Sequence, residues 1–270
     1  MSFVENWNQV VSNHHKQSEN KIVNKSKDDF WEDKVEGFIP PKLPDYNDPT
    51  LSFLITNLQP NSSVLDLGGG AGRLSIPLAQ NNYSITIVDS SKGMINAAEK
   101  HYQYLGLKNV ATYHSTWEEF NNDKYDHIVC AHVMYGVANI KNFILKMKAS
   151  INSSVIIIMY DNSPQSHLAD IWKLYYSEQR INLPAITDLE KVITELDIKY
   201  KLYNIEEYEL PVFDDFDSLL NSIVSQIFIT PNKQNIKKLS DILRNYMTID
   251  NNQYIFPIDL KRKLQAIILD

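Results

Sequence analysis

The sequence predicts an α/β fold in which a mostly parallel β-sheet carries helices on both faces. Between residues 63 and 160, short strand-like runs alternate with longer helical stretches, which is typical of βαβ units. The runs at 84–89 and 154–160 are rich in β-branched residues, as expected of strands that are buried on both faces. The chain has only 8 glycines, and four of them fall within residues 68–72, directly after the first run.

The individual elements follow from apolar spacing and from capping residues. A helix is expected over 50–58, since its apolar residues have helical spacing and Pro60 follows it. Ser90 and Ser91 can cap a helix that Gly106 ends. The other expected strands are 63–67, 110–114 and 125–131, and the other helices are 73–81 and 140–148.

The alternation loosens after residue 161. Helices are expected near 170–179 and 188–196, followed by an extended segment at 199–210 and a final strand at 264–269. Two apolar stripes, at 216–227 and 236–246, predict two more helices between these last strands. The length favours one domain with additions.

Composition limits the kinds of partner. A chain with 43% hydrophobic and 22% charged residues is typical of a globular protein. The net charge of −7 and the four arginines argue against a nucleic-acid substrate. Cys130 is the only cysteine, and the histidine spacing suggests no metal site. The first residues show no secretory pattern and no apolar run could span a membrane, so we expect a cytoplasmic protein without a membrane partner.

The glycine cluster is the main clue to function. It follows a strand and precedes a helix, the context in which a glycine loop lies against a nucleotide-type ligand. A dinucleotide fingerprint requires Gly or Ala at its last position, where this chain offers Arg73 or Ser75. Asp66, two residues before the first glycine, would repel a pyrophosphate and attract a cationic ligand.

Two motifs together resemble a known family. Asp66-Leu67-Gly68-Gly69-Gly70-Ala71-Gly72 resembles motif I of the class I S-adenosylmethionine-dependent methyltransferases. The run from Ile85 to Met94 resembles the second-strand motif of that family, and the likeness covers about residues 50–160. It is closest to the small-molecule methyltransferases.

The resemblance implies a Rossmann-like sheet of seven strands, ordered 3-2-1-4-5-7-6 with the last strand antiparallel. Residues 49–210 and 259–270 would form this core. Residues 1–48 would be a helical arm or lid, with Trp7, Phe30, Trp31 and Phe38 as its aromatic residues. Residues 211–258 would be a helical cap inserted between the last two strands, which with the arm would enclose a small acceptor.

The resemblance also implies a binding site for S-adenosylmethionine. Asp66 would lie near the amino end of the cofactor, and Asp89 would bind both ribose hydroxyls. An acid that usually meets the adenine is missing after the third strand, and Thr116 and Trp117 are expected in its place. The full set of expected cofactor residues is Asp66, Gly68, Gly69, Gly70, Asp89, Ser90, Met94, Thr116, Trp117 and Ala131.

Methyl transfer requires positioning and water exclusion, with a base only if the acceptor must lose a proton. His132 and Tyr135 follow the fourth strand, and Asp161 follows the fifth, so these three are the candidate catalytic residues. Each of these residues could instead have a purely structural role, such as an Asx turn at Asp161. His14 and His15 are expected on a solvated helix face.

The sequence leaves three possible functions. The first is methyl transfer from S-adenosylmethionine to a small-molecule acceptor by in-line displacement. The alternatives are a nicotinamide-dependent oxidoreductase on a related fold and a non-catalytic S-adenosylmethionine-binding protein. Neither the acceptor atom nor the oligomeric state follows from the sequence.

Overall fold

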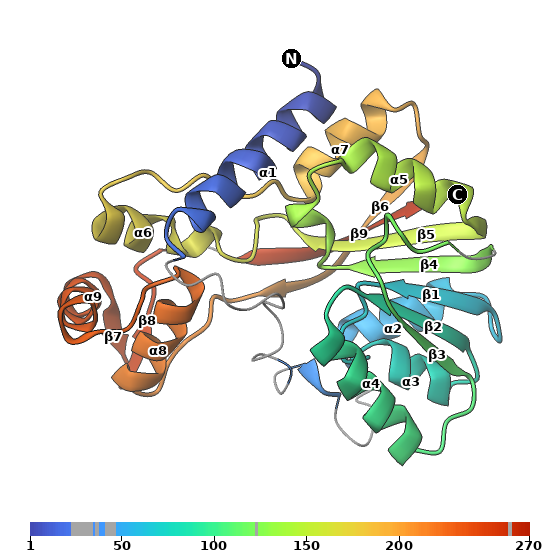
Figure 1. Ribbon diagram of the computed structural model, residues 1–270, viewed down its shortest axis with the longest axis horizontal. Helices are drawn as coiled ribbons and strands as arrows, with labels where there is room; N and C mark the ends of the chain where they lie inside the picture. The colour runs from blue at the N-terminus through green and yellow to red at the C-terminus, as the bar shows by residue number, and fades with distance from the viewer. Residues whose placement is uncertain (23–34, 36–37, 41–46, 122–123, 259–260) are drawn as a thin grey trace.

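A seven-stranded sheet lies at the centre of the protein, in a computed structural model that describes residues 1–22, 35, 38–40, 47–121, 124–258 and 261–270 (Figure 1). The strand order is β3-β2-β1-β4-β5-β9-β6, and β9 runs antiparallel to both of its neighbours. Because β9 is the seventh strand of this sheet along the chain, the predicted order 3-2-1-4-5-7-6 is confirmed. The strands are β1 (Ser63–Leu67), β2 (Ser84–Asp89), β3 (Val110–His114), β4 (Tyr125–Ala131), β5 (Ile151–Tyr160), β6 (Tyr200–Tyr208) and β9 (Arg262–Leu269).

Helices cover both faces of the sheet, as predicted, and each face has its own apolar core (Figure 1). One face carries α1 (Phe3–Glu19), α5 (Ile140–Ala149) and α7 (Ile186–Glu195). The other carries α2 (Pro49–Asn57), α3 (Ser75–Gln80) and α4 (Lys92–Tyr104). The central strands are buried on both sides, since Val155 to Ile158 are all 0% exposed. Burial on both faces explains the β-branched runs.

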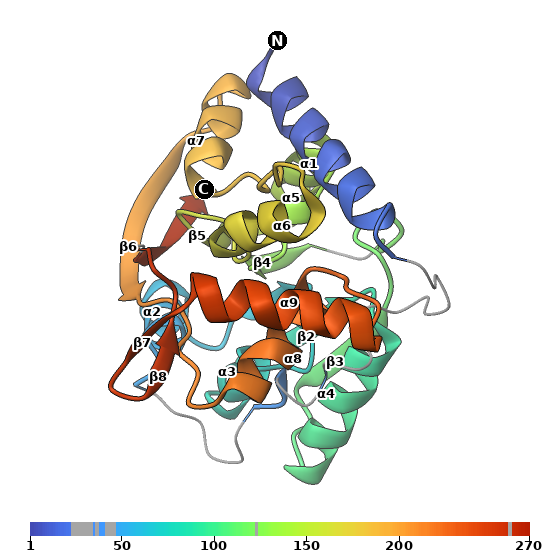
Figure 2. The same ribbon diagram turned by 90° about the vertical axis from the view of Figure 1, so that its left-hand side faces the viewer.

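A third apolar cluster lies beside the sheet and has its own helices and hairpin (Figure 2). Leu219, Ile223, Leu239 and Leu243 are 0% exposed within it, so the two predicted stripes pack against each other. The elements are α6 (Ala169–Tyr176), α8 (Phe216–Gln226), α9 (Lys233–Tyr246), β7 (Thr248–Asp250) and β8 (Gln253–Ile255). Apart from α6, they lie between β6 and β9 in the chain, and the β7–β8 hairpin was not predicted.

Local signals placed most boundaries within a few residues. The Ser91 side chain accepts a hydrogen bond from the Met94 amide, and Gly106 has a φ of +69° directly after α4. The helix expected from Arg73 begins instead at Ser75, because the glycine loop continues as turns to Leu74. Short 3-10 turns also follow β4 (Met134–Gly136) and β5 (Ser166–Leu168).

The N-terminal segment differs from the sequence expectation. Its first part is a single helix, α1, while Phe30 and Trp31 of the predicted lid lie outside the described residues. His14 is 6% exposed, so its predicted solvated position is wrong. Its Nδ1 donates to the Ile181 carbonyl at 2.6 Å and its Nε2 accepts from Arg180 at 2.7 Å. Burial lowers the pKa of His14 to about 4, and the neutral ring fastens α1 to the loop before α7.

Trp7 provides a test of how firmly α1 is held. Its ring is 1% exposed in the core beneath α5, and its Nε1 donates to the Val137 carbonyl at 2.9 Å. We expect Trp7→Ala to lower the free energy of unfolding by about 3–5 kcal/mol, because it leaves a cavity and an unpaired carbonyl. Urea denaturation measures this change. Phe3→Ala, at a side chain that is 52% exposed on the same helix, should change it by less than about 0.5 kcal/mol; equal effects would contradict the tether.

Candidate active site

The glycine loop leaves the end of β1 in a conformation that other residues rarely adopt. Gly68, Gly70 and Gly72 have φ values of +70°, +56° and +86°. Gly69 is required for space, since a Cβ there would lie 2.6 Å from Asp66 Oδ2. A Cβ at Gly68 would overlap the side chain of Val133. The loop backbone therefore packs directly against the strand ends. A residue with a side chain would not fit there without displacing its neighbours.

Two carboxylates hold this loop from the ends of β1 and β2. Asp66 is 4% exposed and accepts a hydrogen bond from the Ser75 hydroxyl at the start of α3. Burial raises the pKa of Asp66 to about 6, although the Ser75 hydrogen bond opposes this shift. Asp89 accepts from the Gly70 amide at 2.9 Å and from the Ser91 amide at 2.8 Å. Both acids thus face the glycine loop.

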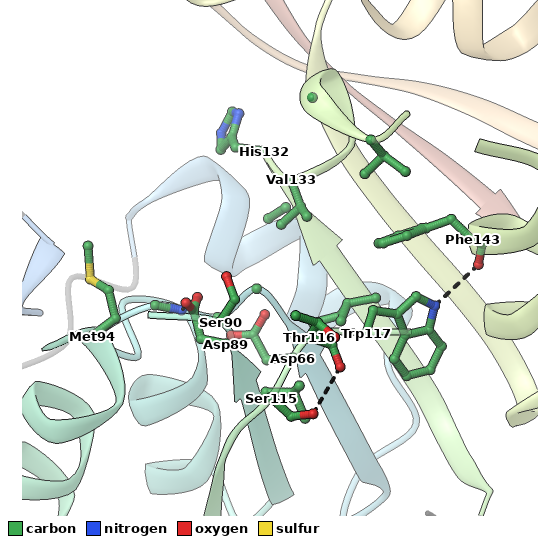
Figure 3. A pocket seen from close by; sticks show the side chains of 18 of the residues that line it. Asp66, Asp89, Ser90, Met94, Ser115, Thr116, Trp117, His132, Val133 and Phe143 are labelled. Carbon is green, nitrogen blue, oxygen red and sulfur yellow. Dashed lines mark hydrogen bonds between the residues drawn. The ribbon is translucent and has the colours of Figure 1, made fainter. Parts of the chain in front are cut away.

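The strand ends and the loop enclose a pocket of about 500 Å³ (Figure 3). Met94 and Trp117 lie at opposite ends of it, with the strand-end acids between them. All ten residues expected to bind the cofactor line this pocket: Asp66, Gly68, Gly69, Gly70, Asp89, Ser90, Met94, Thr116, Trp117 and Ala131. His132 lines it as well.

Trp117 is more deeply anchored than the sequence suggested. It is 5% exposed, its Nε1 donates to the Phe143 carbonyl at 3.3 Å, and Lys146 Nζ lies 4.6 Å from its ring centre. These contacts fix the indole as part of the pocket wall, where little of its surface is left for stacking. Thr116 uses its hydroxyl to donate to Glu119 at 3.0 Å.

His132 sits at the end of β4 in a strained backbone conformation. Its φ is +61°, which is uncommon for a residue with a Cβ. Residues in such conformations cluster at functional sites. Its amide donates to the Ile158 carbonyl at 2.8 Å, so β5 holds the residue in place. Burial lowers the pKa of His132 to about 4, and the charges of Arg73 and Arg262 add to this effect. The imidazole is therefore neutral at pH 7.

Tyr135 and Asp161 do not line the pocket. The Tyr135 hydroxyl accepts from the Tyr160 amide at 2.6 Å and lies 3.4 Å from His132 Nδ1. Asp161 pairs with Lys263, since its Oδ1 accepts from the Lys263 amide at 2.9 Å and its own amide donates to the Lys263 carbonyl at 3.0 Å. Both residues therefore join strand ends, and they reach the pocket only through their neighbours.

Several pocket residues were not identified from the sequence. Val133 and Phe143 form apolar wall, and Arg73 stands where the glycine loop ends. Arg73 Nη1 lies 2.9 Å from Asp48 Oδ2, an ion pair that ties the loop to the N-cap of α2. Phe38, expected in the lid, also lines the pocket. Arg73 was visible as the residue after the last glycine, whereas the apolar residues carry no local signal.

The described residues contain no group of three or more His, Cys, Asp or Glu side chains that could hold a metal ion. In the same part of the chain, no helix is long and apolar enough to cross a membrane.

The pocket fits a cationic nucleoside better than a pyrophosphate. The glycine loop lines the pocket with bare backbone, which the close approach of a ligand requires. Asp66 and Asp89 line the pocket, where an anionic phosphate would be repelled and an ammonium or ribose hydroxyl would find acceptors. Met94, Val133 and Phe143 supply apolar contacts.

This sheet order and pocket define a class of protein, the Rossmann-like methyltransferases. The methyltransferase domain family model matches residues 58–239, about two thirds of the chain, so the chain belongs to this family. It is a methyltransferase, and its cofactor is S-adenosylmethionine. This membership agrees with the first of the three functions open on the sequence and not with the oxidoreductase.

Similar proteins fit this family membership, one by its sequence and two solved structures by their fold alone. A ubiquinone biosynthesis O-methyltransferase of Rickettsia prowazekii is 28% identical over 200 residues, which cover 68% of this chain and 75% of that protein. The YcgJ protein of Bacillus subtilis has the same fold, with a TM-score of 0.56 and 15% identity over 83% of this chain and 98% of that one. A plantazolicin methyltransferase, solved in complex with S-adenosylhomocysteine (SAH), also has this fold. Its TM-score is 0.54, with 16% identity over 99% of this chain and 98% of that one.

The raised pKa of Asp66 predicts an unusual pH dependence of stability. The folded state holds this proton more tightly than the unfolded state, so the contribution of Asp66 is present below about pH 4 and is lost as the pH rises to about 6. Asp66→Asn removes this loss. The stability of the variant relative to the natural protein should therefore increase over that range, by at most about 3 kcal/mol. Urea denaturation of both proteins at a series of pH values measures the difference, and a constant difference would refute the buried, protonated carboxyl.

Proposed function

We propose that this protein transfers the methyl group of S-adenosylmethionine to a hydroxyl oxygen of a small molecule. The observation that carries the proposal is the pocket in which the glycine loop, Asp66 and Asp89 meet beside His132. The O-methyltransferase name of the 28% identical relative supports an oxygen acceptor.

The chain's own residues would perform three tasks. The glycine loop and Asp66 would bind the amino acid end of the cofactor, and Asp89 would accept hydrogen bonds from the ribose hydroxyls, where a carboxylate is the strongest acceptor. Ser90, Met94 and Thr116 would border the adenine. When bound, the cofactor supplies an electrophilic sulfonium methyl.

His132 would act on the acceptor. In the displacement, an acceptor oxygen lone pair forms the new C–O bond, the electrons of the C–S bond pass to sulfur, and the hydroxyl proton leaves. A neutral imidazole can accept that proton or orient the hydroxyl. Tyr135 would position His132, since its hydroxyl lies 3.4 Å from Nδ1. Asp161 would position the start of β9 rather than touch the acceptor.

The three parts of the chain would share this work. Residues 49–210 and 259–270 form the catalytic core, and residues 211–258 would act as a cap over the acceptor, with residues 1–48 as the arm. The position of α8 and α9 beside the end where β9 begins supports the cap (Figure 1). Phe38 in the pocket wall supports the arm.

Asp89 provides the test of the cofactor site. Asp89→Asn removes the charge that strengthens hydrogen bonds to the ribose, so we expect SAH to bind about 10–100-fold more weakly. Isothermal titration calorimetry measures the affinity. Glu19→Gln, an exposed acid at the end of α1, should leave it unchanged. Unaltered binding in Asp89→Asn, or NADH binding in place of SAH, would refute the proposed site.

His132 provides the test of the chemical step. We expect His132→Asn to lower kcat about 10²–10⁴-fold while the Kd for SAH stays within about threefold, because the imidazole would act on the acceptor alone. Radiolabelled methyl transfer to a panel of small molecules that carry hydroxyl groups measures kcat. Tyr135→Phe should lower kcat less, since it only loosens His132. An unchanged kcat in His132→Asn would exclude an acid–base or orienting role.

A further inference from the structure

A second cluster of side chains adjoins the cofactor pocket on its His132 side. We call His132, Tyr160, Tyr208 and Arg262 the strand-end cluster, because these residues come from the ends of β4, β5 and β6 and from the start of β9. His132 belongs to both sites, whereas the other three do not line the cofactor pocket. In Figure 3, the His132 ring points away from Trp117 and Phe143.

The rings of the strand-end cluster form a continuous series. The His132 and Tyr160 ring centres lie 4.9 Å apart, and Tyr208 meets Tyr160 edge to face at 5.8 Å. The Arg262 guanidinium carbon lies 5.1 Å from the Tyr160 ring centre. A flat ligand that contacts His132 would therefore have both aromatic surface and a guanidinium within reach.

Arg262 is poised to receive an anion. Its Nη1 donates to the Pro164 carbonyl at 3.1 Å, which fixes the side chain, but its Nε is buried with no hydrogen-bond partner among the described residues. A buried donor without a partner costs free energy that a ligand acceptor would recover. Arg262 forms no ion pair with any residue that the structure describes.

The neighbouring acids are already engaged. Asp48 is paired with Arg73, and the Asp161 carboxylate accepts from the Lys263 backbone. Glu206, on β6, contributes negative charge at Tyr208 and is exposed. Among the residues that the structure describes, Arg262 is thus a cation near His132 that has no acid partner.

The placement of the arginines is uneven. The chain carries a net charge of −7 and only four arginines, yet two of them, Arg73 and Arg262, act together on His132. A guanidinium presents two parallel N–H donors to a planar carboxylate, and it is less strongly hydrated than an ammonium. Two guanidinium charges that act on His132 favour an anionic ligand beside it.

We propose that the acceptor is a hydroxylated ring bearing a carboxylate, with the carboxylate bound by Arg262 and the ring held against Tyr160 and Tyr208. This assignment rests on the proposed methyl transfer, because it places the acceptor hydroxyl toward His132 and the cofactor pocket. Asp161 has a role in it as a positioning residue, since its two hydrogen bonds to Lys263 fix the start of β9 beside the end of β5.

The test compares a charged probe with its neutral isostere. 3,4-Dihydroxybenzoate and 3,4-dihydroxybenzamide are titrated into SAH-saturated protein, followed by calorimetry or ligand-observed NMR. We expect the carboxylate to bind about 10–100-fold more tightly than the amide. Arg262→Gln should abolish this preference, and Arg262→Lys should retain part of it. Arg244→Gln is the matched control, because Arg244 lies on α9 with its guanidinium carbon 4.1 Å from the Phe216 ring centre.

Each outcome bears on one assignment. Equal binding of the two probes, binding of neither, or a preference that survives Arg262→Gln would overturn the carboxylate subsite. SAH affinity is measured first in every variant and should be unchanged, which also shows that each variant is folded. If the natural protein fails to bind SAH, the proposed methyl transfer itself is wrong, whereas SAH binding without a carboxylate preference refutes only the subsite.

Discussion

The pocket depends on one constraint: the backbone between β1 and α3 must pass between two carboxylates at van der Waals distance. Gly69 has no room for a Cβ because Asp66 occupies that space, and the Gly70 amide donates to Asp89. Asp89 therefore pairs with a loop amide, and burial beneath the loop raises the pKa of Asp66 to about 6. Any side chain larger than glycine at position 69 would displace Asp66 or the loop.

The other wall of the site depends on contacts between strand ends far apart in the chain. The Tyr135 hydroxyl holds the Tyr160 amide, and the Asp161–Lys263 pair joins the end of β5 to the start of β9. Near these contacts, the His132 ring centre and the Arg262 guanidinium carbon lie 4.9 Å and 5.1 Å from the Tyr160 ring centre. Antiparallel insertion of β9 makes this possible, because its first residues then lie beside the carboxyl ends of β5 and β6.

Local sequence signals predicted the elements well and their environments less well. The Ser91 cap, Gly106 and the apolar stripes of α8 and α9 gave correct helices, because capping and amphipathic spacing act within a few residues. His14 was wrongly placed in solvent, since the partners that bury it, Arg180 and Ile181, are more than 160 residues away in the sequence. The late start of α3 and the β7–β8 hairpin were missed for a similar reason, because tertiary packing decides where these turns end and where these short strands pair.

The sequence by itself determined the donor side of this protein. Asp66, the glycines and Asp89 lie within 24 residues of one another on two adjacent strands, so their spacing alone brings them to one edge of the sheet. Only the tertiary structure decided the proposed acceptor side. The strand-end cluster comes from the ends of four strands and spans 131 residues of the chain. Its assembly depends on the strand order and on the antiparallel β9. No local pattern records which strand ends become neighbours, because that is settled by packing of the whole sheet.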